Sequence, residues 1–299
     1  MSYGMNTYWR EIFGWSKTRQ ALWDECKRAY YYHYIGKWEG FRGDRKRERL
    51  QRLSKLKKFI FWKGELIHEV IRNQVTLFSA NKPFLQEGAK KYFVQQVEEV
   101  RRHPEGSITE AVNGHIVSDE RFEAAQTDGL RQLDNFFGLV WPRYRERRLL
   151  EYERLTFFEV RGTKVWVRVD LVTQTDDEKV IITDWKTGDE RWMDVESDEQ
   201  MGVYIMWAID RFDVPLTQIS AEFVFLRSGE SLSVIRTQQQ LEDLKEAISI
   251  RAKEMLAVQT EADFPPSPEE RKCYECNFAT ICPEGKQSIG SAGRNDSVF

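Results

Sequence analysis

The strongest constraint on the fold is a pair of apolar, β-branched runs that both end in charged residues. "VWVRVD" ends at Asp170, and "KVIITDWK" ends with Asp184 and Lys186. The turn-like "TDDE" at 175–178 lies between them, so the two runs are predicted to pair as a hairpin. This pairing brings Asp170 and Asp184 to one end. Lys186 faces the same side as Asp184 because side chains two apart in a strand point alike.

These charged strand ends suit a hard divalent cation. Two clustered carboxylates with a backbone carbonyl are the kind of oxygen ligands that Mg²⁺ or Mn²⁺ prefers. A cation held there polarises a phosphodiester and lowers the pKa of a bound water, while Lys186 orients that water or neutralises developing charge. The D-x-K triplet alone is short. By itself it favours a plainer interpretation, in which Asp184 and Lys186 are a solvated pair and Asp170 is a turn residue.

The surrounding residues change that weighing. "VRVDLV", "VIITDWKTG" and, sixteen residues after Asp184, "QMGVY" follow one another in this order. The combination resembles the RecB-type branch of the PD-(D/E)xK nuclease superfamily. That resemblance implies an α/β fold with a restriction-endonuclease-like mixed β-sheet core flanked by helices. It also implies the catalytic residues Asp170, Asp184, Lys186, Gln200 and Tyr204, the last two sharing one helix face.

The same family places a histidine ligand on an upstream helix in a G-x-x-x-H context, which "GELIH" at 64–68 matches. The resemblance therefore implies that His68 binds Mg²⁺ or Mn²⁺ together with Asp170 and Asp184. A lone histidine is also compatible with a structural role, or with a surface pair with Glu69. The chain departs from the family pattern in two places. Val169 stands where a proline is usual, and the second acid is Asp rather than the commoner Glu, which bears on metal preference.

Three of the four cysteines form a C-x2-C-x5-C cluster: Cys273, Cys276 and Cys282. A closed tetrahedral site needs four ligands. One distant cysteine plus this cluster resembles an iron–sulfur subset of RecB-type nucleases, which includes AddB-type nuclease domains and CRISPR-associated adaptation nucleases. The opening "SKTRQALWDECKRAYYYHYIG" is similar too, with Lys27 replacing the usual proline. The resemblance makes Cys26 the fourth ligand.

Four thiolates fit a [4Fe–4S] cluster or a structural Zn²⁺. Zinc sites usually come as two local cysteine pairs, so the three-plus-one arrangement favours iron–sulfur, with zinc as the alternative. Four unrelated buried cysteines are a third interpretation, against which the tight spacing argues. A cluster here would tie the N-terminal helix to the C-terminal loop and restrict the unfolded chain, without any need for redox work.

A dense basic stretch at 42–63 holds ten Lys or Arg against Asp44 and Glu48. An apolar stripe of Leu50, Leu53, Leu56 and Ile60 makes a solvated amphipathic helix the plainer interpretation. The formal net charge is only −3, so any nucleic-acid binding has to come from local patches. In a nuclease this stretch would line a channel for the DNA backbone. The residues expected to do so are Arg45, Arg49, Arg52, Lys57 and Lys58.

The pattern of helical and β-branched stretches divides the chain into five segments. They are an N-terminal helical region with Cys26 and the basic stretch (1–63), a helical insert carrying His68 (64–150), the nuclease core (151–260), the iron–sulfur loop (261–285) and a disordered tail (286–299). No apolar run approaches the roughly 18 residues of a membrane span. The N-terminus lacks the pattern of a secretory signal, so a cytoplasmic location is expected.

Together these features predict a metal-dependent DNA nuclease, in the form of a single-stranded DNA exonuclease in repair, recombination or end processing. Three alternatives stay open. One is a CRISPR-adaptation nuclease that trims spacer precursors, and another is a nuclease subunit that works with a helicase. The third, from a different class, is a non-catalytic DNA-binding module with structural zinc. Retention of Asp170, Asp184 and Lys186 together argues against that third alternative.

Overall fold

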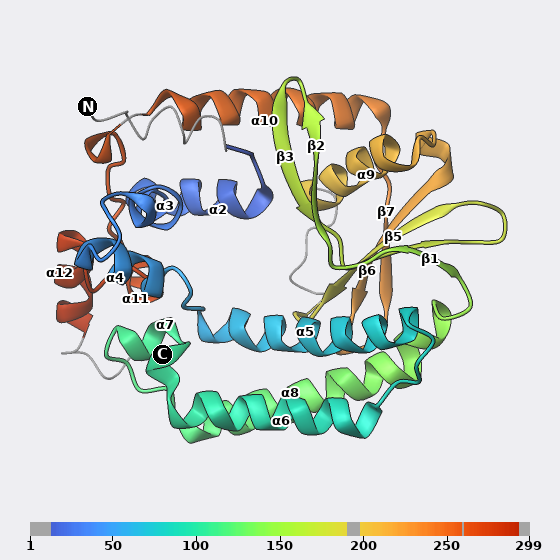
Figure 1. Cartoon of the computed structure of the whole chain (residues 1–299), viewed down its shortest axis with the longest axis horizontal. Helices are drawn as coiled ribbons and strands as arrows, with labels where there is room; N and C mark the ends of the chain where they lie inside the picture. Colours follow the sequence, from blue (N-terminus) through green and yellow to red (C-terminus); the bar gives the residue numbers. More distant parts are fainter. Residues whose placement is uncertain (1–12, 190–197, 259, 293–299) are drawn as a thin grey trace.

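A five-stranded mixed sheet forms the centre of the structure, a computed structural model that describes residues 13–189, 198–258 and 260–292. Its order is β1-β4-β5-β6-β7, with β5 and β6 parallel and the other neighbours antiparallel. Helices flank the sheet, which confirms the expected mixed α/β core (Figure 1). The strands are β1 (Arg148–Glu151), β4 (Leu171–Gln174), β5 (Val180–Lys186), β6 (Ile219–Phe225) and β7 (Ser231–Val234).

A hairpin with its turn at the expected place is formed by β4 and β5, but the run "VWVRVD" is not one of its strands. Leu171 pairs with Thr183 and Gln174 with Val180, so the turn falls at 175–178 as expected. Extending this register by one residue places Asp170 opposite Asp184. The run that ends at Asp170 is not one strand, however. The chain bends at Asp170, and the residues before it belong to a separate two-stranded sheet, β2 (Leu155–Val160) with β3 (Thr163–Arg168).

Alternation along the strands separates two hydrophobic clusters, one on each face of the sheet. Ile182 and Phe223 join the cluster that contains α9 (Glu199–Phe212) and α10 (Gln238–Ala257). Trp185 and Val224 point the other way. They join the cluster built from α5 (Phe59–Ser79), α6 (Gln86–Arg102) and α8 (Asp119–Asn135).

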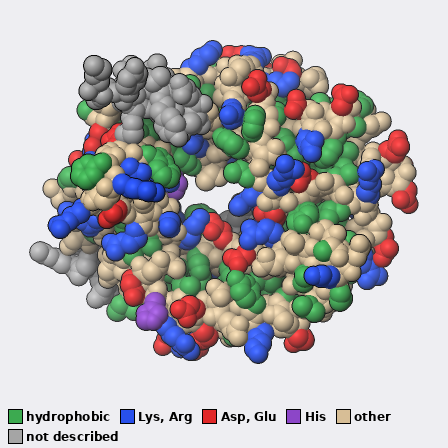
Figure 2. Space-filling model, in the orientation of Figure 1, with side chains coloured by type: hydrophobic (Ala, Val, Ile, Leu, Met, Phe, Trp, Pro, Cys, Tyr) green, Lys and Arg blue, Asp and Glu red, His purple; other side chains and the backbone are tan. Residues whose placement is uncertain are grey.

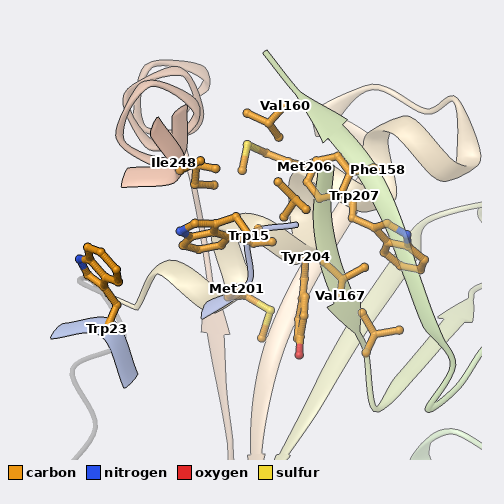
Figure 3. Packing of buried hydrophobic residues seen from close by; sticks show 14 of the residues in the cluster. Trp15, Trp23, Phe158, Val160, Val167, Met201, Tyr204, Met206, Trp207 and Ile248 are labelled. Atoms are coloured by element: carbon orange, nitrogen blue, oxygen red, sulfur yellow. The ribbon is translucent and has the colours of Figure 1, made fainter. Parts of the chain in front are cut away.

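The β2–β3 hairpin packs on the α9 side. Phe158 and Val160 of β2 and Val167 of β3 lie against Met206 and Trp207 of α9, with Trp15 beside them (Figure 3). Trp15 also forms a parallel bridge to Val165 and so ties the start of the described chain to the hairpin.

The segment from Ser16 to Tyr34, in the expected N-terminal helical region, forms two helices separated at Cys26. The Ser16 side chain accepts a hydrogen bond from the Arg19 amide at 3.1 Å, which caps α2 (Lys17–Glu25). Cys26 then adopts an extended conformation, with φ −165° and ψ 114°, before α3 (Lys27–Tyr34). Cys26 therefore interrupts what would otherwise be one continuous helix.

The basic stretch likewise forms two helices rather than one. Helix α4 (Arg45–Leu53) follows η1 (Gly36–Trp38), and α5 begins only at Phe59. Leu50, Leu53 and Leu56 are buried as expected, whereas Ile60 is 68% exposed. The break between the helices shifts the phase of the apolar stripe, so Ile60 no longer falls on the buried face.

Shorter elements complete the described chain. Between α6 and β1 lie η2 (Pro104–Gly106), α7 (Thr109–Val112), a π-helical turn (Phe136–Val140) and η4 (Trp141–Arg143). Later come η6 (Leu216–Gln218), η7 (Glu261–Asp263), α11 (Glu270–Tyr274) and α12 (Pro283–Ala292). Residues 286–292 therefore continue α12 in place of the disorder expected there, and 293–299 lie outside the described residues.

The elements surround an opening through the middle of the molecule (Figure 2). In the view of Figure 1 this opening lies between α2, the β2–β3 hairpin and α5, and Lys and Arg side chains gather around it in Figure 2. Among the described residues, no helix is long and apolar enough to cross a membrane.

Candidate active site and cysteine pocket

The β4–β5 register brings Asp170, Asp184 and Lys186 together. An Asp170 carboxylate oxygen (Oδ2) accepts the Trp185 backbone N–H at 2.7 Å, which fixes the carboxylate at the strand end. Lys186 Nζ lies 2.7 Å from Asp184 Oδ2, as expected for side chains two apart on one strand. Trp185 faces the opposite side, against Phe136 and Tyr144. The sequence-predicted triad is therefore assembled in space.

Helix α9 adds Gln200 and Tyr204. The side chain of Asp198 caps this helix, so Gln200 stands in its first turn and Tyr204 one turn later. Gln200 Nε2 donates to the Tyr204 hydroxyl at 2.7 Å and to Asp184 Oδ1 at 3.3 Å. The Tyr204 hydroxyl donates to the carbonyl of Arg168 at 2.8 Å, just before the bend at Asp170.

The ring of Tyr204 is packed in the apolar cluster on the α9 face, and its hydroxyl points out of the cluster (Figure 3). Burial is the largest cause that raises the pKa of Tyr204 well above its ordinary value. A protonated hydroxyl keeps its donor at any physiological pH. Gln200 and Tyr204 therefore form a fixed polar link from Asp184 to the backbone next to Asp170.

Helix α5 delivers His68 from the opposite face of the sheet. Its Nδ1 lies 3.3 Å from Asp170 Oδ1, the carboxylate oxygen that Trp185 leaves free. Gly64, one turn earlier, allows this approach, because a Cβ there would stand 2.8 Å from the Thr187 hydroxyl. The G-x-x-x-H spacing thus has a packing reason: the glycine lets the helix reach the end of β5.

One acidic residue of the site was missed in the sequence. Glu153, between β1 and β2, places its Oε1 3.6 Å from His68 Nδ1, and its side chain is only 7% exposed. Ligand atoms of His68, Glu153 and Asp170 all lie within 4.8 Å of one another. No motif marks Glu153, because it reaches the site through a turn in the left-handed region, with φ +45°. The one available signal was an acidic residue placed just before a strand.

The electrostatics of the site follow from its crowded carboxylates. Burial, and then the charge of Asp170, raise the pKa of Asp184 to about 7, although Lys186 and His68 oppose this rise. Burial lowers the pKa of His68, but the Asp170 carboxylate outweighs it, so that the pKa rises to about 10. Without a cation, His68 and Lys186 therefore supply the positive charge that the carboxylates require.

The donor set fits a hard divalent cation. Three carboxylates, a histidine nitrogen and nearby backbone carbonyls are ligands of the kind that Mg²⁺ and Mn²⁺ accept. Asp184 is outside the group of atoms within 4.8 Å, since its oxygens face Lys186 and Gln200. Asp170 belongs to both parts of the site: it contacts His68, and it accepts a hydrogen bond from the residue next to Asp184.

The four cysteines, far apart in sequence, line one pocket. Cys26 comes from the break between α2 and α3, Cys273 from α11, and Cys276 and Cys282 from the loop that follows it. Burial raises the pKa of Cys276 to about 12, so this thiol is protonated in the absence of a ligand. Asn113 Nδ2 donates to the carbonyls of Tyr274 and Cys276, at 2.8 and 3.1 Å, and holds the loop.

The spacing of the sulfurs bears on the kind of ligand. A Zn²⁺ with Zn–S distances of about 2.3 Å places its four sulfurs about 3.8 Å apart. Among the described residues, no three of the cysteine sulfurs come within 4.8 Å of one another. As they stand, the sulfurs are therefore not all as close together as four ligands of one tetrahedral Zn²⁺ would be.

The basic residues expected to contact DNA differ in their surroundings. Arg45 and Arg49 line a second pocket with Lys46 and Lys286, next to the cysteine loop. Lys57 lies 2.7 Å from Glu65, and Lys58 lies 3.0 Å from Glu25 and 3.2 Å from Glu275, so acidic partners neutralise both. Arg52 lies in the last turn of α4.

Comparison with known proteins places this constellation in a family. The family model described as "PD-(D/E)XK nuclease superfamily" matches residues 14–283, and the chain belongs to that superfamily. Members of this superfamily are nucleases that typically use Mg²⁺ or Mn²⁺. The fold is accordingly restriction-endonuclease-like.

The other comparisons add little. No curated protein matches the chain. A solved structure titled "Crystal structure of SSO0001" aligns at 17% identity over 45% of this chain, with a TM-score of 0.27. The alignment covers 60% of that chain, less than two thirds of its length.

Proposed function

We propose that this protein is a RecB-type, Mg²⁺- or Mn²⁺-dependent deoxyribonuclease that hydrolyses phosphodiester bonds at Asp170, Asp184 and Lys186. The single observation that carries the proposal is the β4–β5 register, which sets two carboxylates and a lysine at one buried strand end. A solvated pair, the plainer interpretation, does not fit, because the side chains of Asp184 and Lys186 are only 5% and 25% exposed.

Each residue has a distinct task in this proposal. Asp170, Asp184 and His68 hold the cation, which when bound polarises the phosphodiester and lowers the pKa of an attacking water. Lys186 orients that water or offsets charge that develops on the phosphate. Its ammonium already touches both Asp184 and Gln200, at 2.7 and 3.3 Å, and so is held in place before substrate arrives.

Gln200 and Tyr204 position the other groups. Through their mutual hydrogen bond and the contact with Asp184, they fix the carboxylate against α9. The match to the superfamily spans residues 14–283. Within that superfamily, the presence of Gln200 and Tyr204 together with His68 supports assignment to the RecB-type branch.

We further propose that Cys26, Cys273, Cys276 and Cys282 bind a [4Fe–4S] cluster. All four thiols line one pocket, and their three-plus-one arrangement in the sequence is less typical of zinc than of an iron–sulfur cluster. Structural Zn²⁺ is the less well supported alternative. The cluster would act as a clasp that ties the α2–α3 break to the C-terminal loop, remote from the strand end where hydrolysis takes place.

We infer that the substrate is single-stranded DNA and that the protein is an exonuclease in repair, recombination or end processing, as its resemblance to RecB-type nucleases implies. The opening in Figure 2 is bordered by α5, the helix that carries His68, and Lys and Arg side chains gather around it. Arg45, Arg49 and Lys286 supply a phosphate-binding surface at one side of the molecule, where Lys46 pairs with Glu261. Because acidic residues neutralise Lys57 and Lys58, we assign those two lysines to the framework rather than to DNA.

A cleavage assay tests the proposal. Strands labelled at the 5′ or the 3′ end, single or double, are incubated with the protein plus Mn²⁺, Mg²⁺ or EDTA. We expect cation-dependent shortening of single strands from one end, and loss of this activity in Asp170→Asn. Cleavage that persists in EDTA, or that Asp170→Asn leaves intact, would refute the assignment.

A further inference from the structure

Glu153 is the most unusual residue of the site. Its backbone lies in the left-handed region, at φ +45°, which few residues other than glycine or asparagine adopt without cost. Its carboxylate is nevertheless carried into the interior, with 7% of the side chain exposed. A strained backbone and a buried charge at one position each cost free energy, of about 1 kcal/mol or more for the backbone alone.

The surrounding structure holds this residue where it is. The backbone N–H of Glu153 donates to the carbonyl of Val169 at 2.7 Å, so that Glu153 is tied to the residue next to Asp170. This contact joins the β1–β2 connection to the bend before β4. The position of the carboxylate is thus coupled directly to the position of Asp170.

The cationic groups that face Glu153 do not satisfy it fully. Its Oε1 lies 3.6 Å from His68 Nδ1, and its Oε2 lies 3.5 Å from Arg168 Nε. Charge-assisted hydrogen bonds between nitrogen and oxygen are about 2.7–2.9 Å long. Both contacts are longer than this, so the carboxylate oxygens of Glu153 can accept a further, closer ligand.

We propose that Glu153 is a further ligand of the divalent cation, on the His68 side of Asp170. Two neighbouring ligands of an octahedral ion with bonds of about 2.1 Å stand about 3 Å apart. His68 Nδ1 is 3.3 Å from Asp170 Oδ1 and 3.6 Å from Glu153 Oε1, close to that separation. The inference rests on the proposed function, because it concerns the same cation.

This ligand set also defines a preference. An imidazole nitrogen with carboxylate oxygens suits Mn²⁺ better than Mg²⁺, which favours oxygen ligands and keeps its waters. Asp184 pairs with Lys186, which leaves it less of its negative charge for the cation. The carboxylate of Glu153 supplies negative charge in its place. We expect tighter binding of Mn²⁺ than of Mg²⁺.

The rival role is structural: Glu153 would only neutralise His68 and Arg168. The two roles differ in what Glu153→Gln changes. This substitution keeps the shape and removes the charge. A ligand role predicts weaker Mn²⁺ binding, whereas a structural role predicts a lower unfolding temperature of the cation-free protein with unchanged Mn²⁺ affinity.

Direct cation binding decides between them. Mn²⁺ is titrated into full-length protein with its cysteine site intact, and free Mn²⁺ is followed by electron paramagnetic resonance. Glu151→Gln is the matched control, since Glu151 is similarly buried, at 12% side-chain exposure, but pairs with Arg154. Thermal unfolding without cation reports the folding of each variant.

We expect Glu153→Gln to weaken Mn²⁺ binding about tenfold or more, and Glu151→Gln to bind as wild type does. Equal affinities of Glu153→Gln and wild type would overturn the inference, and the proposed function would still stand if wild type cleaves DNA with Mn²⁺. Wild type that neither binds Mn²⁺ nor cleaves DNA would overturn both.

Discussion

Asp184→Asn should make the cation-free protein more stable while abolishing its activity. The side chain of Asp184 is buried, and Asp170 lies opposite it in the β4–β5 register. Burial and the charge of Asp170 raise its pKa from 3.8 to about 7. The native state therefore holds the ionised carboxylate less well than the unfolded chain does, and asparagine removes that penalty.

The size of the effect follows from the pKa. At 1.36 kcal/mol per unit, a rise of about three units corresponds to about 4 kcal/mol when Asp184 is fully ionised. The variant also removes the carboxylate that lies 2.7 Å from Lys186, and the loss of this ion pair offsets part of the gain in stability. We expect a net gain of about 1–3 kcal/mol at pH 8, or several degrees in the unfolding temperature.

The pH dependence has a definite sign. Because the native pKa of Asp184 is the higher one, the contribution of Asp184 to stability falls as pH rises from about 4 to about 7, and the variant lacks this contribution. Thermal unfolding of both proteins in EDTA, between pH 4 and pH 8, measures the difference. A variant that is less stable than wild type at pH 8, or a difference that does not change with pH, would refute the reasoning.

Three other substitutions test separate parts of the structure. Gly64→Ala places a Cβ 2.8 Å from the Thr187 hydroxyl, so we expect the free energy of unfolding to fall by about 1–3 kcal/mol and the activity to be lost. Gly88→Ala is the control: its Cβ would have its nearest contact at 3.5 Å, so it should be neutral in the same unfolding and cleavage assays. Burial lowers the pKa of His33 to about 3, so the unfolded chain takes up the proton first as pH falls. Between pH 7 and pH 5, wild type should therefore lose about 2 kcal/mol of stability relative to His33→Gln, which urea unfolding at the two pH values would measure. Cys26→Ser should remove visible absorbance and iron and lower the unfolding temperature; a colourless wild type with stoichiometric zinc would contradict the iron–sulfur assignment.

The parts of the site that could be predicted from sequence are those set by short-range rules. The two-residue period of a strand places Lys186 beside Asp184, and a short turn between two runs sets Asp170 opposite. The four-residue spacing of Gln200 and Tyr204 on α9 likewise puts both on one face. These rules need no knowledge of the rest of the fold.

Other features depend on contacts that no local pattern reveals. Glu153 enters the site because its N–H meets Val169, a contact between two connections. The break at Cys26 overrides a continuous helical pattern, and it places that thiol in the cysteine pocket. Ile60 is exposed because α5 starts afresh at Phe59. The division of the chain into five segments stays a prediction.

The measurement that tests the central claim most directly is single-turnover hydrolysis of an end-labelled single strand with Mn²⁺, compared between wild type, Lys186→Ala and Lys179→Ala. Lys186 lies 2.7 Å from Asp184 at the strand end, whereas Lys179 is an exposed turn residue 3.2 Å from Asp177. The account predicts that Lys186→Ala binds the strand but loses hydrolysis by about 100-fold or more, and that Lys179→Ala cleaves like wild type. Hydrolysis by Lys186→Ala at the wild-type rate would contradict it.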